Sequence, residues 1–307
     1  MTIASTSTSA FFDRAMIDMA SLRAQAEKLQ GQVSSGAKLT TSSDDPLAAS
    51  RLRSLARSDG LGKIDMASSQ RATVDLNLAD SALNQFTSYT IRAQELTTQA
   101  ASDTLSTTQR ASIGLELAQI HNGLVGIANA RDSAGKALFG GDSPGDAYQL
   151  NGAGNASYIG TGVAGTLSLG DGQGVARSLT GPEFFNFNDP AGNPTDLLAV
   201  LKSLADTLQA GGAGAAAAAS TALGSLANGL DALTTAQTIV GSRLAWIDLS
   251  TERQQAMEEA RTSEQADIGV PDLASSLARL QQLSTVLEAS QRSFSQLASL
   301  SLFDLIR

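Results

Sequence analysis

The sequence has no cysteine and a single histidine, His121. Without cysteine, the chain can have no disulfide framework, no thiol catalysis and no thiolate metal site. One histidine alone argues against a histidine-rich zinc centre or a conventional metal-dependent hydrolase. The sequence therefore predicts no cofactor and no metal site.

Aromatic side chains, positive charge and long apolar runs are also scarce. Aromatic residues make up only 4% of the chain and the formal net charge is −9, so the basic face of a nucleic-acid-binding protein is not expected. No stretch approaches the roughly 20 apolar residues of a membrane span, so we expect no membrane insertion. The segment 1–10 is rich in Ser and Thr and has neither a basic nor an apolar region, unlike a Sec-type signal peptide.

No set of residues for an enzyme can be named, because no nucleophile, base and orienting group occur in a recognisable pattern. Asp44 and Asp45 could form an acid–base pair, but a helix cap next to Pro46 explains them better. His121 lies between Ile120 and Asn122 on an expected helix and has no histidine partner. The glycine-rich pieces at 152–154 and 170–174 lack the strand–loop–helix context and the lysine of a phosphate-binding loop. We therefore expect a protein that is not an enzyme.

Apolar residues recur every seven positions near both ends of the chain, the pattern of a helix that packs on another helix. We call these positions the terminal seam. Its members are Phe12, Met19, Leu22, Leu29, Val33, Leu280, Leu287 and Phe294. A single seam of this kind buries too little surface to offset the entropy of ordering its helix. We expect both termini to be mobile in the monomer and to order against neighbouring copies.

The rest of the chain divides into helical and β-prone stretches. Helical heptads continue through Leu226, Leu233, Val240 and Ile247, whereas residues 137–194 are rich in Gly, Asn, Asp and Pro, with short β-prone pieces. The predicted fold is mainly α: an elongated antiparallel helical bundle built from both chain ends, with a small β-rich central insert domain. The predicted domains are a terminal helical assembly domain (1–42 with 264–307, mobile in the monomer), a helical rod domain (43–136 with 195–263) and a β-rich surface insert (137–194).

Several motifs in these helical ends resemble a known family. The N-terminal block runs from Ser34-Ser35-Gly36 to Ser43-Asp44-Asp45-Pro46, and a second motif, Ser301-Leu302-Phe303-Asp304, lies near the C-terminus. Both are similar to the signatures of flagellins and of flagellar hook-associated protein 3 (FlgL). The pieces 135–141, 240–243 and 263–268 also resemble that family. The residues that carry the resemblance most clearly are Gly36, Ser43, Asp44, Asp45, Pro46, Ser301, Leu302 and Phe303.

The resemblance implies a structural part of the bacterial flagellum that joins hook to filament as hook-associated protein 3. Its implied partners are hook-associated protein 1, flagellin and copies of itself, together with a cytoplasmic export chaperone similar to FlgN. Such subunits leave the cell through the flagellar type III apparatus, so the implied location is the extracellular flagellum.

Two other functions remain open. A minor flagellin that polymerises along the filament would carry the same motifs. A surface glycan-binding module in the insert would have to use its few aromatic residues for sugar stacking. These residues are Tyr148, Tyr158, Phe184, Phe185 and Phe187.

Overall fold

The computed structural model describes residues 3–304, and the side chains of residues 10–297. The chain packs as two compact units. Unit 1 comprises Met1–Gly60 with Met257–Arg307, and unit 2 comprises Leu61–Ala256. Among the described residues, no helix combines the length and the apolar character needed to cross a lipid bilayer.

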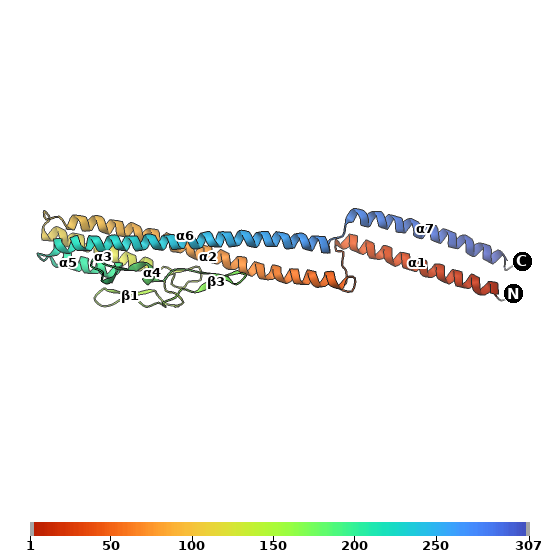
Figure 1. The fold of residues 1–307 in the computed structure, drawn as a ribbon, viewed down its shortest axis with the longest axis horizontal. Helices are drawn as coiled ribbons and strands as arrows, with labels where there is room; N and C mark the ends of the chain where they lie inside the picture. The colour runs from red at the N-terminus through yellow and green to blue at the C-terminus, as the bar shows by residue number, and fades with distance from the viewer. Residues whose placement is uncertain (1–2, 305–307) are drawn as a thin grey trace. The chain divides into compact units, whose positions relative to one another are not determined.

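Unit 1 is built from the two ends of the chain. It contains α1 (Ile3–Ser35), the start of α2 (Pro46–Ala100), the end of α6 (Ala215–Gly269) and α7 (Leu273–Asp304). α1 packs against α7 (Figure 1). Phe12 near the start of α1 meets Phe294 near the end of α7, and Lys38 after α1 meets Gly269 before α7, so the two helices run antiparallel. The predicted pairing of the N-terminal with the C-terminal helix is confirmed.

Unit 2 contains a four-helix core made by α2, α3 (Thr107–Ala128), α5 (Leu197–Ala210) and α6. α3 packs on α5. Arg92 on α2 pairs with Glu116 on α3, and Gln237 on α6 donates a hydrogen bond to Asn84 on α2. Ser106 caps α3 through a reciprocal capping box with Gln109, and Asp196 caps α5 through the Ala199 amide. The second part of the predicted rod domain, 195–263, thus has its first helix from Leu197.

The heptad positions of α2 and α6 form the centre of this core. Leu226, Leu233, Val240 and Ile247 are all buried, as the sequence pattern predicts. The matching row on α2 alternates large residues such as Leu76 with small ones such as Ala79. Small residues let the helices approach closely, which explains how a chain with so few aromatic residues still fills a core.

The insert consists of three separate antiparallel hairpins and a short helix. The strand pairs are β1 (Tyr148–Leu150) with β2 (Ala156–Tyr158), β3 (Thr166–Gly170) with β4 (Gln173–Ala176), and β5 (Asn186–Asn188) with β6 (Pro194–Asp196). α4 (Gly181–Phe185) lies between the second and third hairpins. The mainly α fold with a small β-rich insert is therefore confirmed.

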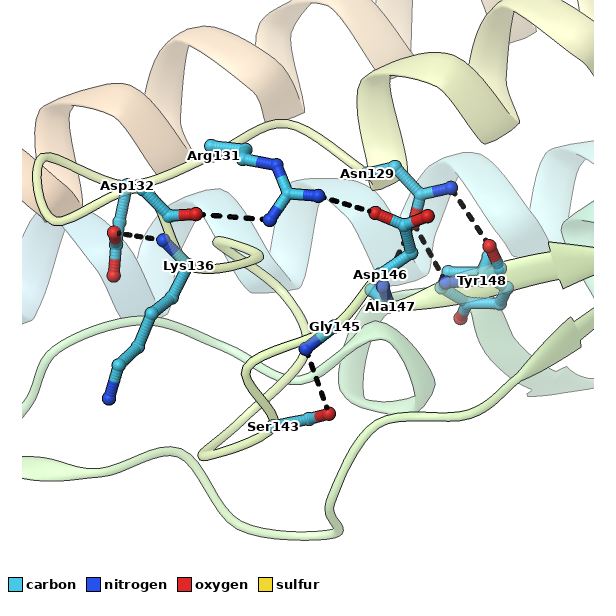
Figure 2. Close-up of polar contacts among 10 residues, drawn as sticks. Asn129, Arg131, Asp132, Lys136, Ser143, Gly145, Asp146, Ala147 and Tyr148 are labelled. Carbon is cyan, nitrogen blue, oxygen red and sulfur yellow. Dashed lines mark hydrogen bonds and ion pairs between the residues drawn. The ribbon is translucent and has the colours of Figure 1, made fainter.

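A single asparagine ties the end of α3 to the first hairpin (Figure 2). The Asn129 side-chain oxygen accepts hydrogen bonds from the Ala147 and Tyr148 amides, and its amide group donates to the Tyr148 carbonyl. Arg131 adds a 2.8 Å ion pair to Asp146. The segment that leaves the helical region is thus held by side chains where regular strand pairing has not yet begun.

Two further polar clusters attach the insert to the helices of unit 2. Arg177 lies between the buried carboxylates of Asp75, on α2, and Asp132, in the turn after α3. The β3–β4 hairpin is held by Gln254 of α6, which donates to the Leu169 carbonyl. Gly170 lies against Asp65 of α2, because its φ of +88° and its lack of a Cβ allow the close approach.

Candidate assembly surface

The loop between α1 and α2 contains the family-like motif, and Asp44 organises it. α1 ends at Ser35, and Gly36 takes a φ of +66°, a conformation that favours glycine. The Asp44 carboxylate accepts hydrogen bonds from the Thr40 amide and hydroxyl and from the Thr41 amide, and it pairs with Lys28 at 2.8 Å. The Lys28 ammonium, followed by the loop donors, holds the pKa of Asp44 well below its usual range.

The neighbouring residues of the motif start α2. The Asp45 carboxylate accepts hydrogen bonds from the Leu47 and Ala48 amides, and Pro46 occupies the first helical position. Ser43 lies within hydrogen-bonding distance of Thr41 through their hydroxyl groups. The predicted capping role of Asp45 is confirmed. The Asp44 carboxylate instead accepts hydrogen bonds from amides of the loop and does not cap the helix.

The terminal seam lies along the contact between α1 and α7. On α1 the half-buried positions repeat with the three–four spacing of a coiled coil, and on α7 the same spacing appears. Each of the eight predicted seam residues is half-buried rather than fully buried: Phe12, Met19, Leu22, Leu29, Val33, Leu280, Leu287 and Phe294. Phe12 and Phe294 meet with ring centroids 5.4 Å apart. Two helices alone therefore cover only part of the seam.

Sequence reasoning missed part of this surface. Leu283, three residues after Leu280, is only 8% exposed, and its place in the three–four spacing was a signal that could have identified it. Phe11, Met16 and Ile17 lie beside the seam on α1 and are 53%, 53% and 68% exposed. Leu273, by contrast, continues the seven-residue spacing but is exposed.

A shallow groove of about 280 Å³ follows the seam on the α1 side. Apolar side chains of α1 form most of its wall, and Arg14 and Asp18 supply one charge of each sign. The lining residues are Phe11, Arg14, Ala15, Asp18, Met19, Leu22 and Ser290. A groove of this shape and character suits the apolar face of a further helix.

Polar contacts fix the ends of α2 and α6 within unit 1. The Arg51 guanidinium donates two hydrogen bonds to the Glu264 carboxylate in a bidentate arrangement, with N–O distances of 2.5 and 2.8 Å. Asp59 accepts hydrogen bonds from Arg261 and Gln265. Glu264 and Gln265 belong to the acidic family-like piece 263–268, so this piece lies where the structure links the two helices.

The loop after α1 also meets the turn between α6 and α7. The Lys38 amide donates a 2.7 Å hydrogen bond to the Gly269 carbonyl, and Pro271 of that turn is buried. Ser301, Leu302 and Phe303 belong to the last turn of α7, and their side chains lie outside the described residues.

Three of the five aromatic residues considered for a glycan-binding insert are buried. Phe184 and Phe185 are completely buried, and they pack with Phe86 and Phe139 at centroid distances of 4.8–5.4 Å. Tyr148 is also buried. The expectation that Tyr148, Phe184 and Phe185 could stack on a sugar is wrong, because their rings are buried in the core of unit 2. Tyr158 and Phe187 are half-buried.

Comparisons with known proteins agree with this architecture. Residues 7–143 match the family model of the bacterial flagellin N-terminal helical region. The fold is similar to FlgL of Xanthomonas campestris (TM-score 0.62, 15% identity, 69% of this chain and 99% of that one). It is also similar to flagellar hook-associated protein 3 of Legionella pneumophila (TM-score 0.64, 14% identity, 70% of this chain and 98% of that one). The chain thus shares the helical fold of these two structures.

Within this class, the resemblance to one protein extends over almost the full length. The chain is 26% identical to flagellar hook-associated protein 3 of Escherichia coli over 318 residues, covering 97% of this chain and 98% of that protein. It is 27% identical to the Salmonella typhimurium protein of the same name, covering 98% and 99%. The resemblance to hook-associated protein 3 is therefore confirmed over almost the full length of the chain.

Proposed function

We propose that the chain joins the flagellar hook to the filament, and that it assembles through the terminal seam. The main support for this proposal is that the seam residues are only half-buried in the α1–α7 pair. Each copy leaves apolar surface that neighbouring copies would cover, and many such weak contacts together give a strong assembly. The relatives are structural flagellar proteins, and we infer a structural role without catalysis.

The partners of this role are hook-associated protein 1 on the hook side and flagellin on the filament side. Copies of the chain itself are the lateral partners. A chaperone similar to FlgN would cover α7 before export, since the seam residues Leu280, Leu287 and Phe294 would otherwise be exposed in the cytoplasm. Export through the flagellar type III apparatus would then place the chain in the extracellular flagellum, and the termini would order on assembly.

The experiment that tests this role is localisation in the organism that makes the protein. Immunogold labelling with antibodies against residues 137–194 should mark a short band between hook and filament. Deleting the gene should leave hooks without filaments and release flagellin into the medium. Filaments that persist after the deletion would overturn the proposal.

A minor flagellin is the second candidate, and the match of residues 7–143 to the flagellin N-terminal region favours it. The same labelling separates the two functions. A minor flagellin would be labelled along the filament, and its deletion would leave filaments in place.

A further inference from the structure

A row of exposed apolar residues on α6 lies outside the terminal seam and inside unit 2. Ile239, Trp246 and Leu249 are 37%, 43% and 58% exposed. Seven residues separate the first two and three separate the last two, so all lie on one side of the helix. Trp246 is the only tryptophan of the chain. Tryptophan is one of the residue types enriched where interfaces concentrate their binding energy. We call this row the α6 stripe.

A second row lies on α2, also in unit 2. Ile64, Arg71 and Leu78 follow one another at intervals of seven residues, and Val74 lies between the last two. All four side chains are exposed, including 63% of Ile64 and 41% of Leu78. We call this row the α2 stripe.

The two stripes face away from each other. Gln237 of α6 donates hydrogen bonds to Asn84 and Thr87 of α2, so these residues mark the sides on which the two helices meet. Trp246 comes nine residues after Gln237, and Leu78 comes nine residues before Thr87. Nine residues are two and a half turns of an α-helix. Each stripe therefore lies on the outer flank of its helix.

The stripes also lie at the same level along the helix pair. Asn84 meets Gln237, and Asp65 lies with Gln254 around Gly170, so α2 and α6 run antiparallel. Nine residues forward along α6 thus correspond to nine residues back along α2, and Trp246 is level with Val74. Two copies placed side by side in the same orientation would bring the α6 stripe of one copy to the α2 stripe of the next.

The charges of the two flanks are complementary. Arg71 is exposed on the α2 stripe, and within the described part of the chain it has neither an ion pair nor a hydrogen bond. Glu252, three residues after Leu249, is exposed and equally without a partner within that part. A guanidinium group stacks favourably on an indole ring and pairs with a carboxylate. Arg71 of one copy can therefore interact with Trp246 and Glu252 of another.

We propose that the α6 stripe of one copy docks onto the α2 stripe of a second copy of this chain. The proposal rests on the assembly role described above and adds a lateral contact that does not use the terminal helices. Because the two surfaces differ, the contact is heterologous and continues from copy to copy, around a ring if the rotation closes or along a helix if it does not.

Cysteine cross-linking tests the contact directly, because the natural chain has no cysteine. Ser81→Cys lies next to the α2 stripe and Ser242→Cys lies next to the α6 stripe, and both serines are exposed. Flagella isolated from cells that make the full-length double variant are treated with a short bismaleimide. We expect a ladder of cross-linked multimers of the chain from the double variant, and no cross-linked dimer from either single variant.

Other patterns would overturn the inference. Dimers from a single-cysteine variant would mean that one flank pairs with itself, and cross-links only to a different flagellar protein would mean that the stripe binds another partner. If the chain is present in flagella but no ladder forms, the lateral contact is wrong while the junction role stands. If the chain is absent from flagella, the junction role fails. The purified full-length double variant is then cross-linked at high concentration, where absence of a ladder overturns the contact.

Charge reversal adds a test of the electrostatic pairing. We expect Arg71→Glu to lower the cross-linking yield of the double-cysteine chain by about tenfold, and Glu252→Arg to lower it as well. Combining the two reversals should restore much of the yield. Lys136→Glu makes the same change of charge at an exposed lysine in the turn after α3, away from both stripes, and should leave the yield unchanged. Failure of the combined variant to recover would contradict the pairing of Arg71 with Glu252.

Discussion

Gly114 of α3 faces α5, and the neighbouring helix occupies the space that any side chain would need. A Cβ at this position would lie 2.8 Å from the Ala205 carbonyl oxygen and 3.0 Å from the side chains of Leu208 and Gln209. The backbone of α5 cannot yield as a flexible side chain would. Gly126, on the same helix, has nothing within 4 Å of its own Cβ position. The two glycines therefore differ in their surroundings although both are helical.

We predict opposite effects for alanine at these two positions. Gly114→Ala should lower the free energy of unfolding by about 1–3 kcal/mol, because it forces α3 and α5 apart. Gly126→Ala should raise it by up to about 1 kcal/mol, because alanine favours the helix. Urea unfolding of the two variants and the natural chain measures both values. Equal effects of the two substitutions would contradict the close contact between α3 and α5.

His121 is a second position where the surroundings of one residue affect the stability of the fold. Its side chain is only 1% exposed, and within the described residues Nε2 has no hydrogen-bond partner. Burial lowers the pKa of His121 from its ordinary value of 6.5, while the Asn122 side chain opposes the shift. Lys202 of α5 also lowers this pKa, and Asp196 and Asp206 raise it. The histidine therefore packs in the core in its neutral form.

This burial predicts a loss of stability in acid. The unfolded chain binds the His121 proton at higher pH than the folded chain, so the free energy of unfolding falls as pH drops below about 6.5, until the lower folded-state pKa is reached. The slope from this group is at most about 1.4 kcal/mol per pH unit. His121→Leu should remove that part of the pH dependence. Urea unfolding at pH 7.5 and pH 5.5 compares the two proteins, and an equal decline in both would disprove the prediction.

At the scale of elements, α1 and α7 differ from the helices of unit 2 in how fully they bury their heptads. Leu226 and Leu233 of α6 have no exposed surface, whereas Leu22 and Leu287 are only half-buried. A charge at a half-buried seam position should therefore disturb assembly more than it disturbs the main core.

We expect Leu22→Asp to block polymerisation, because a carboxylate in the seam would have to be buried between copies without a partner. The main melting transition should change little, because it reports the core of unit 2. Ala24→Asp places the same charge on the exposed side of α1 and should leave polymerisation intact. Light scattering measures polymerisation and circular dichroism measures melting. A large fall in the melting temperature of Leu22→Asp would show that the seam is fully packed within one copy.

The helices could be predicted because their signals are local. A seven-residue period, a cap such as Asp45 before Pro46, and a stop such as Gly36 each lie within a few residues. The ion pairs of Arg177 with Asp75 and Asp132 join three distant segments, so no local pattern predicts them. The outer stripes were missed for a related reason. Arg71 interrupts the apolar spacing of α2, and only the positions of Asn84 and Gln237 show which flank is free.

For the whole molecule, the division into units cannot be predicted from helix breaks alone. The loop 36–45 marks a visible end of one helix, and the sequence predicts a domain boundary there. The packing divides instead at Gly60 and Met257, inside α2 and α6, which continue as single helices across the division. The bounds of each unit depend on which apolar residues pack together. That packing depends on contacts between the two halves of the chain.

Removing residues 1–35 tests whether the two units are energetically separate. Unit 2 keeps its own core without α1, because its buried residues come from α2, α3, α5, α6 and the insert. We expect the main melting temperature to stay within about 2 °C of the natural value. α7 loses its partner, so Leu280 and Leu287 become exposed and its helix should unfold, lowering the helical signal by more than α1 alone accounts for.

The same truncated chain should fail to enter the flagellum, because the α1 side of the seam is gone. Circular dichroism measures the core and immunoblots of isolated flagella measure incorporation. The variant Ala24→Asp, which keeps the full length, is the control for incorporation. A truncated chain that melts at a much lower temperature would show that unit 2 depends on α1. Normal incorporation would show that the terminal seam is not what holds neighbouring copies together.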